Sequence, residues 1–216
     1  MSPDFSTIWP FDQLRLLTPR LELHPIRDED IPGLVTASLE GIHDPAEMPF
    51  AIPWTRQEPM ELARGTAQHV WLARANLRPQ AWNVSFVIIE NDTVVGRQDV
   101  VANQFRDRRT VETGSWLTHS RQGRGLGKEM RVAVLLWAFD WLGAEYAETA
   151  AMAGNPASQG VSEGLGYRRN GITRHRVAEG EVYDSLLYRL AAADLKRPDW
   201  QLEVHGHEQV AALLGA

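Results

Sequence analysis

The residues best suited to chemistry lie in one glycine-rich segment, Arg121-Gln122-Gly123-Arg124-Gly125-Leu126-Gly127-Lys128, between a strand-like run and a helix. Glycines in such a turn let backbone N–H groups converge on one point, and the following helix adds positive potential at its N-terminus. The side chains of Arg121, Arg124 and Lys128 add positive charge around that point. The segment therefore predicts a phosphate site, and a pyrophosphate-bearing ligand suits it better than a carboxylate does.

Two common phosphate-binding loops do not fit this segment. A Walker loop needs four residues between its glycines and a Ser or Thr after its lysine, but Glu129 follows Lys128 here. A dinucleotide fingerprint needs G-x-G-x-x-G and an acidic residue at the far end of the next strand. This segment has G-x-G-x-G, and Glu145 lies at the beginning of the next strand. Both classes of nucleotide site are therefore excluded.

The glycine segment must be held by a strand before it and a helix after it. Alternating polarity, β-branched residues and turn signals predict strands over residues 20–24, 81–90, 93–101, 111–118, 145–152, 167–177 and 181–190. Apolar spacing and start signals predict helices that begin near residue 28, cover residues 60–77 and 132–142, and begin again at Asn155-Pro156. Strand 111–118, the glycine segment, its helix and strand 145–152 form a β-loop-α-β unit, so these two strands should be parallel.

Length and composition restrict the class of protein. The 216 residues are 44% hydrophobic and 23% charged, which is typical of a globular chain and not of a disordered or coiled-coil one. We expect one domain over residues 1–190 and a C-terminal extension, with the character of an appendage, over residues 191–216. Residues 41–58 combine prolines with His43, Phe50 and Trp54, and we expect a loop that can line a pocket with aromatic side chains.

Charge and cysteine content exclude further classes. With 22 Lys and Arg against 28 Asp and Glu, the net charge is -6, which disfavours nucleic-acid or membrane binding and favours a cationic or amine substrate. The chain has no cysteine, so disulfides, thiolate metal sites and cysteine nucleophiles are excluded, and we expect no metal site. It has no apolar run of about 18 residues and no signal-peptide pattern at its start, so we expect a cytoplasmic protein.

Three motifs resemble those of the GNAT superfamily of N-acetyltransferases. Residues 122–127 resemble the family's Q/R-x-x-G-x-G/A loop for acetyl-CoA. Asn155-Pro156-Ala157-Ser158, followed by Leu165-Gly166-Tyr167, resembles the N-x-x-S…G-F/Y pattern of the RimJ/RimL-like branch. The resemblance extends over residues 20–190. It implies an α/β (α+β) fold, with a mixed, mostly antiparallel, six- to seven-stranded sheet that is splayed between its fourth and fifth strands and flanked by helices.

The resemblance also implies a cosubstrate, acetyl-CoA, and residues that handle it. The expected cofactor-binding residues are Trp116, Leu117, Thr118, Gln122, Gly123, Arg124, Gly125, Leu126, Gly127, Lys128, Asn155 and Ser158. A backbone N–H near Trp116 or Leu117 would stabilise the thioester oxygen, Ser158 would protonate the departing thiolate, and Asn155 would hold the pantetheine arm. For the base we choose Glu112, acting directly or through a water, because its strand runs beside the thioester.

Each of these assignments has a purely structural alternative. Glu112 on a strand is often an outward-facing, solvated carboxylate. Asn155 and Ser158 are also sufficient as the N-cap and first turn of a helix. Asp184 on the last strand would either contact the substrate amine or pair with an arginine. Trp137 and Trp141 share their helix with many aliphatic residues, so we expect both in the core.

Two functions from different classes remain open. The first is an acetyl-CoA-dependent N-acetyltransferase that acts on a primary amine, either a protein or peptide N-terminus or a small-molecule amine. The second is a catalytically silent acyl-CoA-binding protein of the same fold, which serves as a sensor or partner. The joint presence of Glu112 and Ser158 favours the enzyme. The expected partners are the amine substrate and, as an option, a second copy of the chain in a homodimer.

Overall fold

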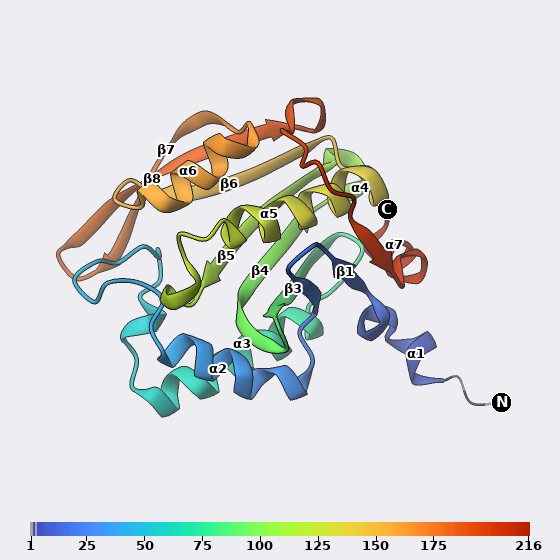
Figure 1. Ribbon diagram of the computed structural model, residues 1–216, viewed down its shortest axis with the longest axis horizontal. Coiled ribbons are helices and arrows are strands. Elements are labelled where there is room, and N and C mark those ends of the chain that lie inside the picture. The colour runs from blue at the N-terminus through green and yellow to red at the C-terminus, as the bar shows by residue number, and fades with distance from the viewer. Residues whose placement is uncertain (1, 3) are drawn as a thin grey trace.

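A nine-stranded sheet in the order β7-β8-β6-β5-β4-β3-β2-β1-β9 runs through the protein, whose computed structural model describes residues 2 and 4–216 (Figure 1). The strands are β1 Arg15–Leu17, β2 Glu22–Pro25, β3 Ala81–Glu90, β4 Thr93–Asn103, β5 Thr110–Leu117, β6 Tyr146–Met152, β7 Arg168–Ala178, β8 Glu181–Ala191 and β9 Glu203–His205. All neighbouring strands are antiparallel except β5 and β6, which are parallel. The predicted mixed, mostly antiparallel sheet is therefore confirmed, with two more strands than the largest number expected.

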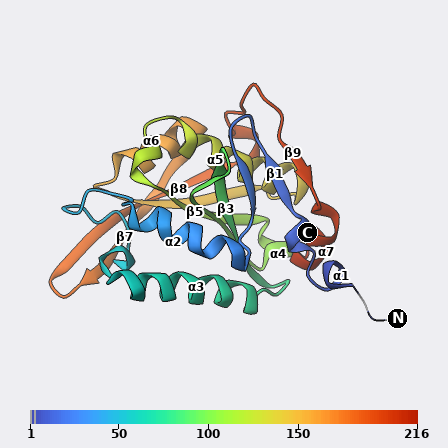
Figure 2. The ribbon, with the colours of Figure 1, turned by 60° about the horizontal axis from the view of Figure 1, so that its bottom comes forward.

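The helices divide between the two faces of the sheet. Their bounds are α1 Phe5–Ile8, α2 Ile31–Leu39, α3 Pro59–Ala75, α4 Phe105–Arg108, α5 Leu126–Leu136, α6 Pro156–Leu165 and α7 His207–Leu214. Helices α2 and α3 cover one face, where Leu34 and Val70 pack with Val87 of β3, and α5 and α6 cover the other (Figure 2). No helix in residues 2 and 4–216 has both the length and the apolar character needed to cross a membrane.

The central hairpin forms as its turn residues predict. Strands β3 and β4 pair from Ala81↔Asn103 to Glu90↔Thr93. The two residues between them, Asn91 and Asp92, have φ values of 49° and 60°, the left-handed conformation that a two-residue hairpin turn needs and that Asn and Asp tolerate. This hairpin places β4 beside β5 and so supports the strand that leads into the glycine segment.

Helix α5 packs across the sheet and continues into one π-helical turn, Trp137–Trp141. Trp137 is fully buried against Phe86, as predicted. The prediction for Trp141 is wrong, because this residue lies at the end of the helix, where it is 45% exposed and makes an edge-on contact with the ring of His207. An apolar run does not specify the turn at which a helix leaves the core.

The C-terminal segment joins the sheet and the core. Strand β9 pairs with β1, and Val210 and Leu214 of α7 are fully buried. The indole N–H of Trp82 on β3 donates a hydrogen bond to the carbonyl of Leu214 at 3.1 Å. Residues 203–214 are therefore part of the folded domain and are not a separate appendage.

The sheet splits between β5 and β6. The parallel ladder joins only Thr110–Glu112 to Tyr146–Glu148, although β5 runs on to Leu117 and β6 to Met152. At the point of divergence, the hydroxyl of Thr149 donates to the carbonyl of Thr113 at 2.7 Å. These two strands are the expected fourth and fifth, so the split lies where the resemblance implies and opens toward the glycine segment that follows β5.

Candidate active site

The glycine segment presents free backbone N–H groups at the start of α5. Gly123 and Gly125 adopt φ values of +71° and +82°, a conformation that residues with a Cβ rarely accept. The N–H groups of Gly123, Arg124 and Gly125 donate to no backbone carbonyl in the described residues, and all three residues are exposed. No other atom would lie within 4 Å of a Cβ on Gly123. The loop therefore fits an anion that is bound by main-chain donors.

A buried carboxylate anchors this loop from below. Glu129, in the first turn of α5, is 7% exposed and accepts hydrogen bonds from Thr18 Oγ1 at 2.7 Å and from Arg20 Nε at 2.6 Å. Arg20 Nη1 in turn donates to the carbonyl of Arg124 at 2.9 Å. The sequence did not indicate this contact, because no local pattern links residues more than a hundred positions apart.

The charged side chains of the loop already have partners. Arg121 and Arg124 form ion pairs of 3.2 and 3.3 Å with Glu90, whose side chain is 5% exposed. Gln122 Nε2 donates to the carbonyls of Ile42 and Leu117 at 2.6 and 2.9 Å, so its amide ties the loop to the rest of the protein. Lys128 is exposed. Cations therefore surround the loop as expected, but Glu90 holds two of them.

Three of the expected cofactor-binding residues have a backbone N–H or a side chain that is not free to contact a ligand. The N–H of Thr118 donates to the carbonyl of Val95 in β4 at 2.9 Å. Because N–H groups alternate between the two edges of a strand, the N–H of Trp116 also points to β4, whereas that of Leu117 points into the split. The side chain of Leu126 is fully buried. The N–H groups of Trp116 and Thr118 are therefore directed to β4, and the assignment of Trp116, Thr118 and Leu126 as cofactor-binding residues stays a prediction.

Glu112 lies on the face of the sheet that α2 and α3 cover. It is exposed, and its partner in the ladder is Glu148 of β6, whose carboxylate lies 3.8 Å from Arg189. Trp116 lies on the same face of β5, two residues from the exposed, side-chain-free Gly114. The position suits a base that meets an amine arriving from this face.

Aromatic side chains form a wall beside that face. Trp116 stacks near Trp54 at 5.9 Å between ring centroids, and Trp54 near Phe50 at 5.3 Å. Arg56, next to this wall, forms an ion pair of 3.1 Å with Glu181 at the start of β8. Residues 41–58 and the β7–β8 hairpin, which lie close together in Figure 1, are therefore joined across the acceptor side of the sheet.

Asn155 and Ser158 have the structural role that the sequence allowed. Asn155 Oδ1 accepts the N–H of Ser158 at 3.0 Å and so caps α6. Helix α6 packs against the start of α5, where Val161 lies beside Gly127, and Ser158 lies about one turn before Val161. Asp184 pairs with Arg174 at 3.2 Å, which is the second of the two roles considered for it.

A polar cluster fills the base of the split on the α5 side. Arg131 of α5 is 4% exposed and donates to Gln98 Oε1, Thr149 Oγ1 and Ser115 Oγ at 3.3, 3.3 and 2.9 Å. Burial lowers the pKa of Arg131, and the nearby phenol of Tyr167 acts against that shift. All of these partners are neutral groups, so a positive charge lies below the split without a carboxylate.

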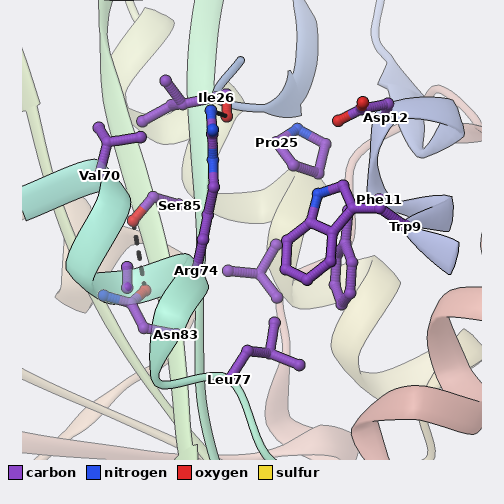
Figure 3. A pocket seen from close by; sticks show the side chains of 12 residues that line it. Trp9, Phe11, Asp12, Pro25, Ile26, Val70, Arg74, Leu77, Asn83 and Ser85 are labelled. Atoms are coloured by element: carbon purple, nitrogen blue, oxygen red, sulfur yellow. Dashed lines mark hydrogen bonds between the residues drawn. The ribbon is translucent and has the colours of Figure 1, made fainter. Parts of the chain in front are cut away.

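Two cavities lie away from the split. One of about 30 Å³ lies between α3 and the β2–β3 pair, lined by residues that include Phe11, Val70 and Arg74, and is too small for a cosubstrate (Figure 3). A larger hollow of about 370 Å³ is lined by Trp141, Trp200 and other residues at the opposite end of α5 from the glycine segment.

Solved structures of other proteins share this fold. RimJ of Mycobacterium smegmatis, in complex with CoA-disulfide, is 19% identical with a TM-score of 0.66, over 93% of this chain and 92% of its own. The Salmonella typhimurium acetyl transferase that modifies the N-terminal serine of ribosomal protein L7/L12 is 16% identical with a TM-score of 0.64, over 81% and 96%. A GCN5-related N-acetyltransferase from Brucella melitensis is 19% identical with a TM-score of 0.64, over 83% and 79%.

The family is set by the sequence itself. The profile of the acetyltransferase (GNAT) domain matches residues 20–168, from the arginine that anchors the glycine loop to the first residue of β7. This match includes the split, the glycine loop and α6. The chain therefore belongs to the GNAT acetyltransferases and is an acetyl-CoA-dependent N-acetyltransferase.

Proposed function

We propose that the protein acetylates the α-amine at the N-terminus of a peptide or protein. Acetyl-CoA supplies the acetyl group as a thioester. The observation that carries the proposal is the split itself, which has a free N–H edge on β5, the glycine loop at one end and Glu112 on the acceptor face. Relatives with the same fold include an enzyme that modifies an N-terminal serine.

The glycine loop would bind the pyrophosphate. The N–H groups of residues 123–125 would donate to its oxygens, and the N-terminus of α5 would add positive potential. Arg121 and Arg124, which Glu90 now holds, would turn toward the phosphates. Asn155 would contact the pantetheine arm while it caps α6.

Glu112 would take the proton from the amine through intervening water, because it lies five residues, or roughly 17 Å of extended strand, from Leu117. Amines are mostly protonated at neutral pH, so the nitrogen needs a base before it can attack. The N–H of Leu117, at the edge of the split, would donate to the thioester oxygen as that oxygen gains charge. Ser158 would give a proton to the departing sulfur. Each residue would therefore serve one of the three requirements of acyl transfer to an amine.

A small-molecule amine is the second candidate acceptor. The Arg56–Glu181 ion pair and the aromatic wall, which meets β5 at Trp116, would narrow the approach to the open end of the split and so favour a small ligand over a folded protein surface. A flexible N-terminal peptide would still reach the split by its first residues. The net charge of -6 suits cationic acceptors of both kinds.

The acceptor is tested with a panel of short peptides, free amino acids, polyamines and amino sugars at fixed acetyl-CoA. The rate of thiol release is measured for each. We expect peptides with a free α-amine to turn over and peptides with a blocked N-terminus to fail. Turnover of small amines alone would overturn the N-terminal proposal. If no acceptor gives time-dependent thiol release, the alternative of a CoA-binding protein without turnover would be favoured.

A further inference from the structure

The charge on Arg131 lacks the compensation that buried charges normally have. A guanidinium stays protonated in proteins, so a nearly complete burial of Arg131 means a buried positive charge. Buried charges are usually paired, because removal from water is costly. No carboxylate lies within ion-pair distance of Arg131 among residues 2 and 4–216.

The hydrogen bonds of the cluster direct this charge toward one hydroxyl. Thr149 Oγ1 accepts a hydrogen bond from Arg131, and its hydroxyl donates one to the carbonyl of Thr113, so this donor is already used. Ser115 Oγ accepts from Arg131 Nη2 at 2.9 Å, which leaves its proton free to donate elsewhere. Ser115 is also the half-buried member of the cluster, whereas Gln98, Thr149 and Arg131 are buried. Ser115 is therefore the group through which the cluster reaches the split.

Negative charge appears in the split during the proposed reaction. When the acetyl carbon moves to the amine nitrogen, the carbon–sulfur bond breaks and its electron pair stays on sulfur. A hydroxyl that already accepts from a guanidinium is a stronger donor, because such hydrogen bonds polarise one another. Tyr167, the other titratable group beside Arg131, is kept neutral because burial raises the pKa of its phenol. It therefore supplies no negative charge to Arg131.

We propose that Ser115 donates a hydrogen bond to the CoA sulfur as it becomes a thiolate, and that Arg131 is the positioning residue that orients and polarises Ser115. This inference rests on the proposed function and adds two residues to it. It is separate from the role given to Ser158, which supplies the proton itself. The uncompensated charge of Arg131 thus serves the step in which the carbon–sulfur bond breaks, where negative charge develops on the sulfur before Ser158 protonates it.

The test measures the thiol pKa of CoA bound to the protein, by the ultraviolet absorbance of the thiolate across a pH series. In the native protein we expect this pKa to lie about one pH unit or more below that of free CoA, because a hydrogen bond from a polarised donor favours the charged form. Ser115→Ala and Arg131→Met should return it toward the free value. Arg131→Lys, which keeps the charge, should retain part of the shift.

Two controls separate the possible failures. Binding of desulfo-CoA, which has no sulfur, should be equal in the native protein and in Ser115→Ala, which shows that the variant folds and keeps the loop. If the native protein does not bind desulfo-CoA, the proposed function itself would be contradicted. Two results would overturn only the roles of Ser115 and Arg131. In the first, desulfo-CoA binds normally but neither Ser115→Ala nor Arg131→Met changes the thiol pKa of bound CoA. In the second, only Ser158→Ala changes that pKa.

Discussion

Replacing Gly125 with valine tests the cofactor loop most directly. Gly125 has a φ of +82°, and a Cβ there would lie 3.4 Å from Arg20 Nη2. The left-handed conformation costs a residue with a Cβ about 1–2 kcal/mol, which in a chain of this size lowers Tm by roughly 2–8 °C. The valine methyl groups also cover the N–H groups of the loop. Loss of even one hydrogen bond to a charged phosphate removes about 1.5–3 kcal/mol, or roughly ten- to a hundredfold in affinity.

Gly180 offers a matched control for the backbone strain. It lies in the β7–β8 turn with a φ of +76° and open space around a Cβ. Gly180→Val should therefore lower Tm about as much as Gly125→Val does, since the strain is the same.

Calorimetric titration with CoA distinguishes the two variants. We expect Gly180→Val to keep the native Kd and Gly125→Val to lose at least about tenfold in affinity. Circular dichroism should show both to be folded. Equal CoA affinity in the two variants would refute the assignment of the pyrophosphate to this loop.

Three further predictions concern acidic residues. Glu112→Gln should lower kcat/KM at neutral pH by about a hundredfold or more, with part of the rate recovered at high pH, where free amine is abundant. The control Glu148→Gln should keep the native pH profile. The reverse result would make Glu148 the base. Glu129→Gln should lower the free energy of unfolding by about 1–3 kcal/mol and weaken CoA binding, whereas the exposed Glu61→Gln should change stability by less than about 0.5 kcal/mol. The hydrogen bond from Arg15 holds the pKa of Glu22 below its usual value, so the stability it contributes is complete above pH about 4.3 and is lost as the pH falls further. Glu22→Gln should flatten this acid limb in urea titrations, and an unchanged limb would show that the pair contributes nothing.

The sequence predicted the parts of the fold that have a local cause. Strands β3 and β4 follow from β-branched residues and the Asn91-Asp92 turn, and α6 begins at its Asn155 cap as expected. Strands β1 and β9 were missed, because three residues are too few for alternation to be seen. Their pairing depends on Leu16 opposite Val204, a contact between chain ends that no window of sequence contains.

Only part of the candidate site was predicted, again because contacts between distant segments leave no local pattern in the sequence. The glycine spacing identified the loop, but the Arg20–Glu129 contact that holds it and the Glu90 contact that holds Arg121 and Arg124 join distant segments. Whether a strand N–H faces the split or the next strand also depends on pairing, which is why Trp116 and Leu117 were not distinguished. The roles of Glu112 and Ser158, the cytoplasmic location and the homodimer stay predictions.

Arg131 is the residue at which local pattern and structure disagree most. It directly precedes the apolar run 132–142, where a charged residue would ordinarily mark the solvated end of a helix face. The fold instead buries it beneath Ser115, with neutral partners that cannot offset the desolvation of a full charge. A methionine would remove that desolvation cost but would leave the buried Gln98 Oε1 without its donor, so packing and hydrogen bonding give a reason for a polar donor here and none for a full charge. A reaction that generates an anion in the split above it does give one.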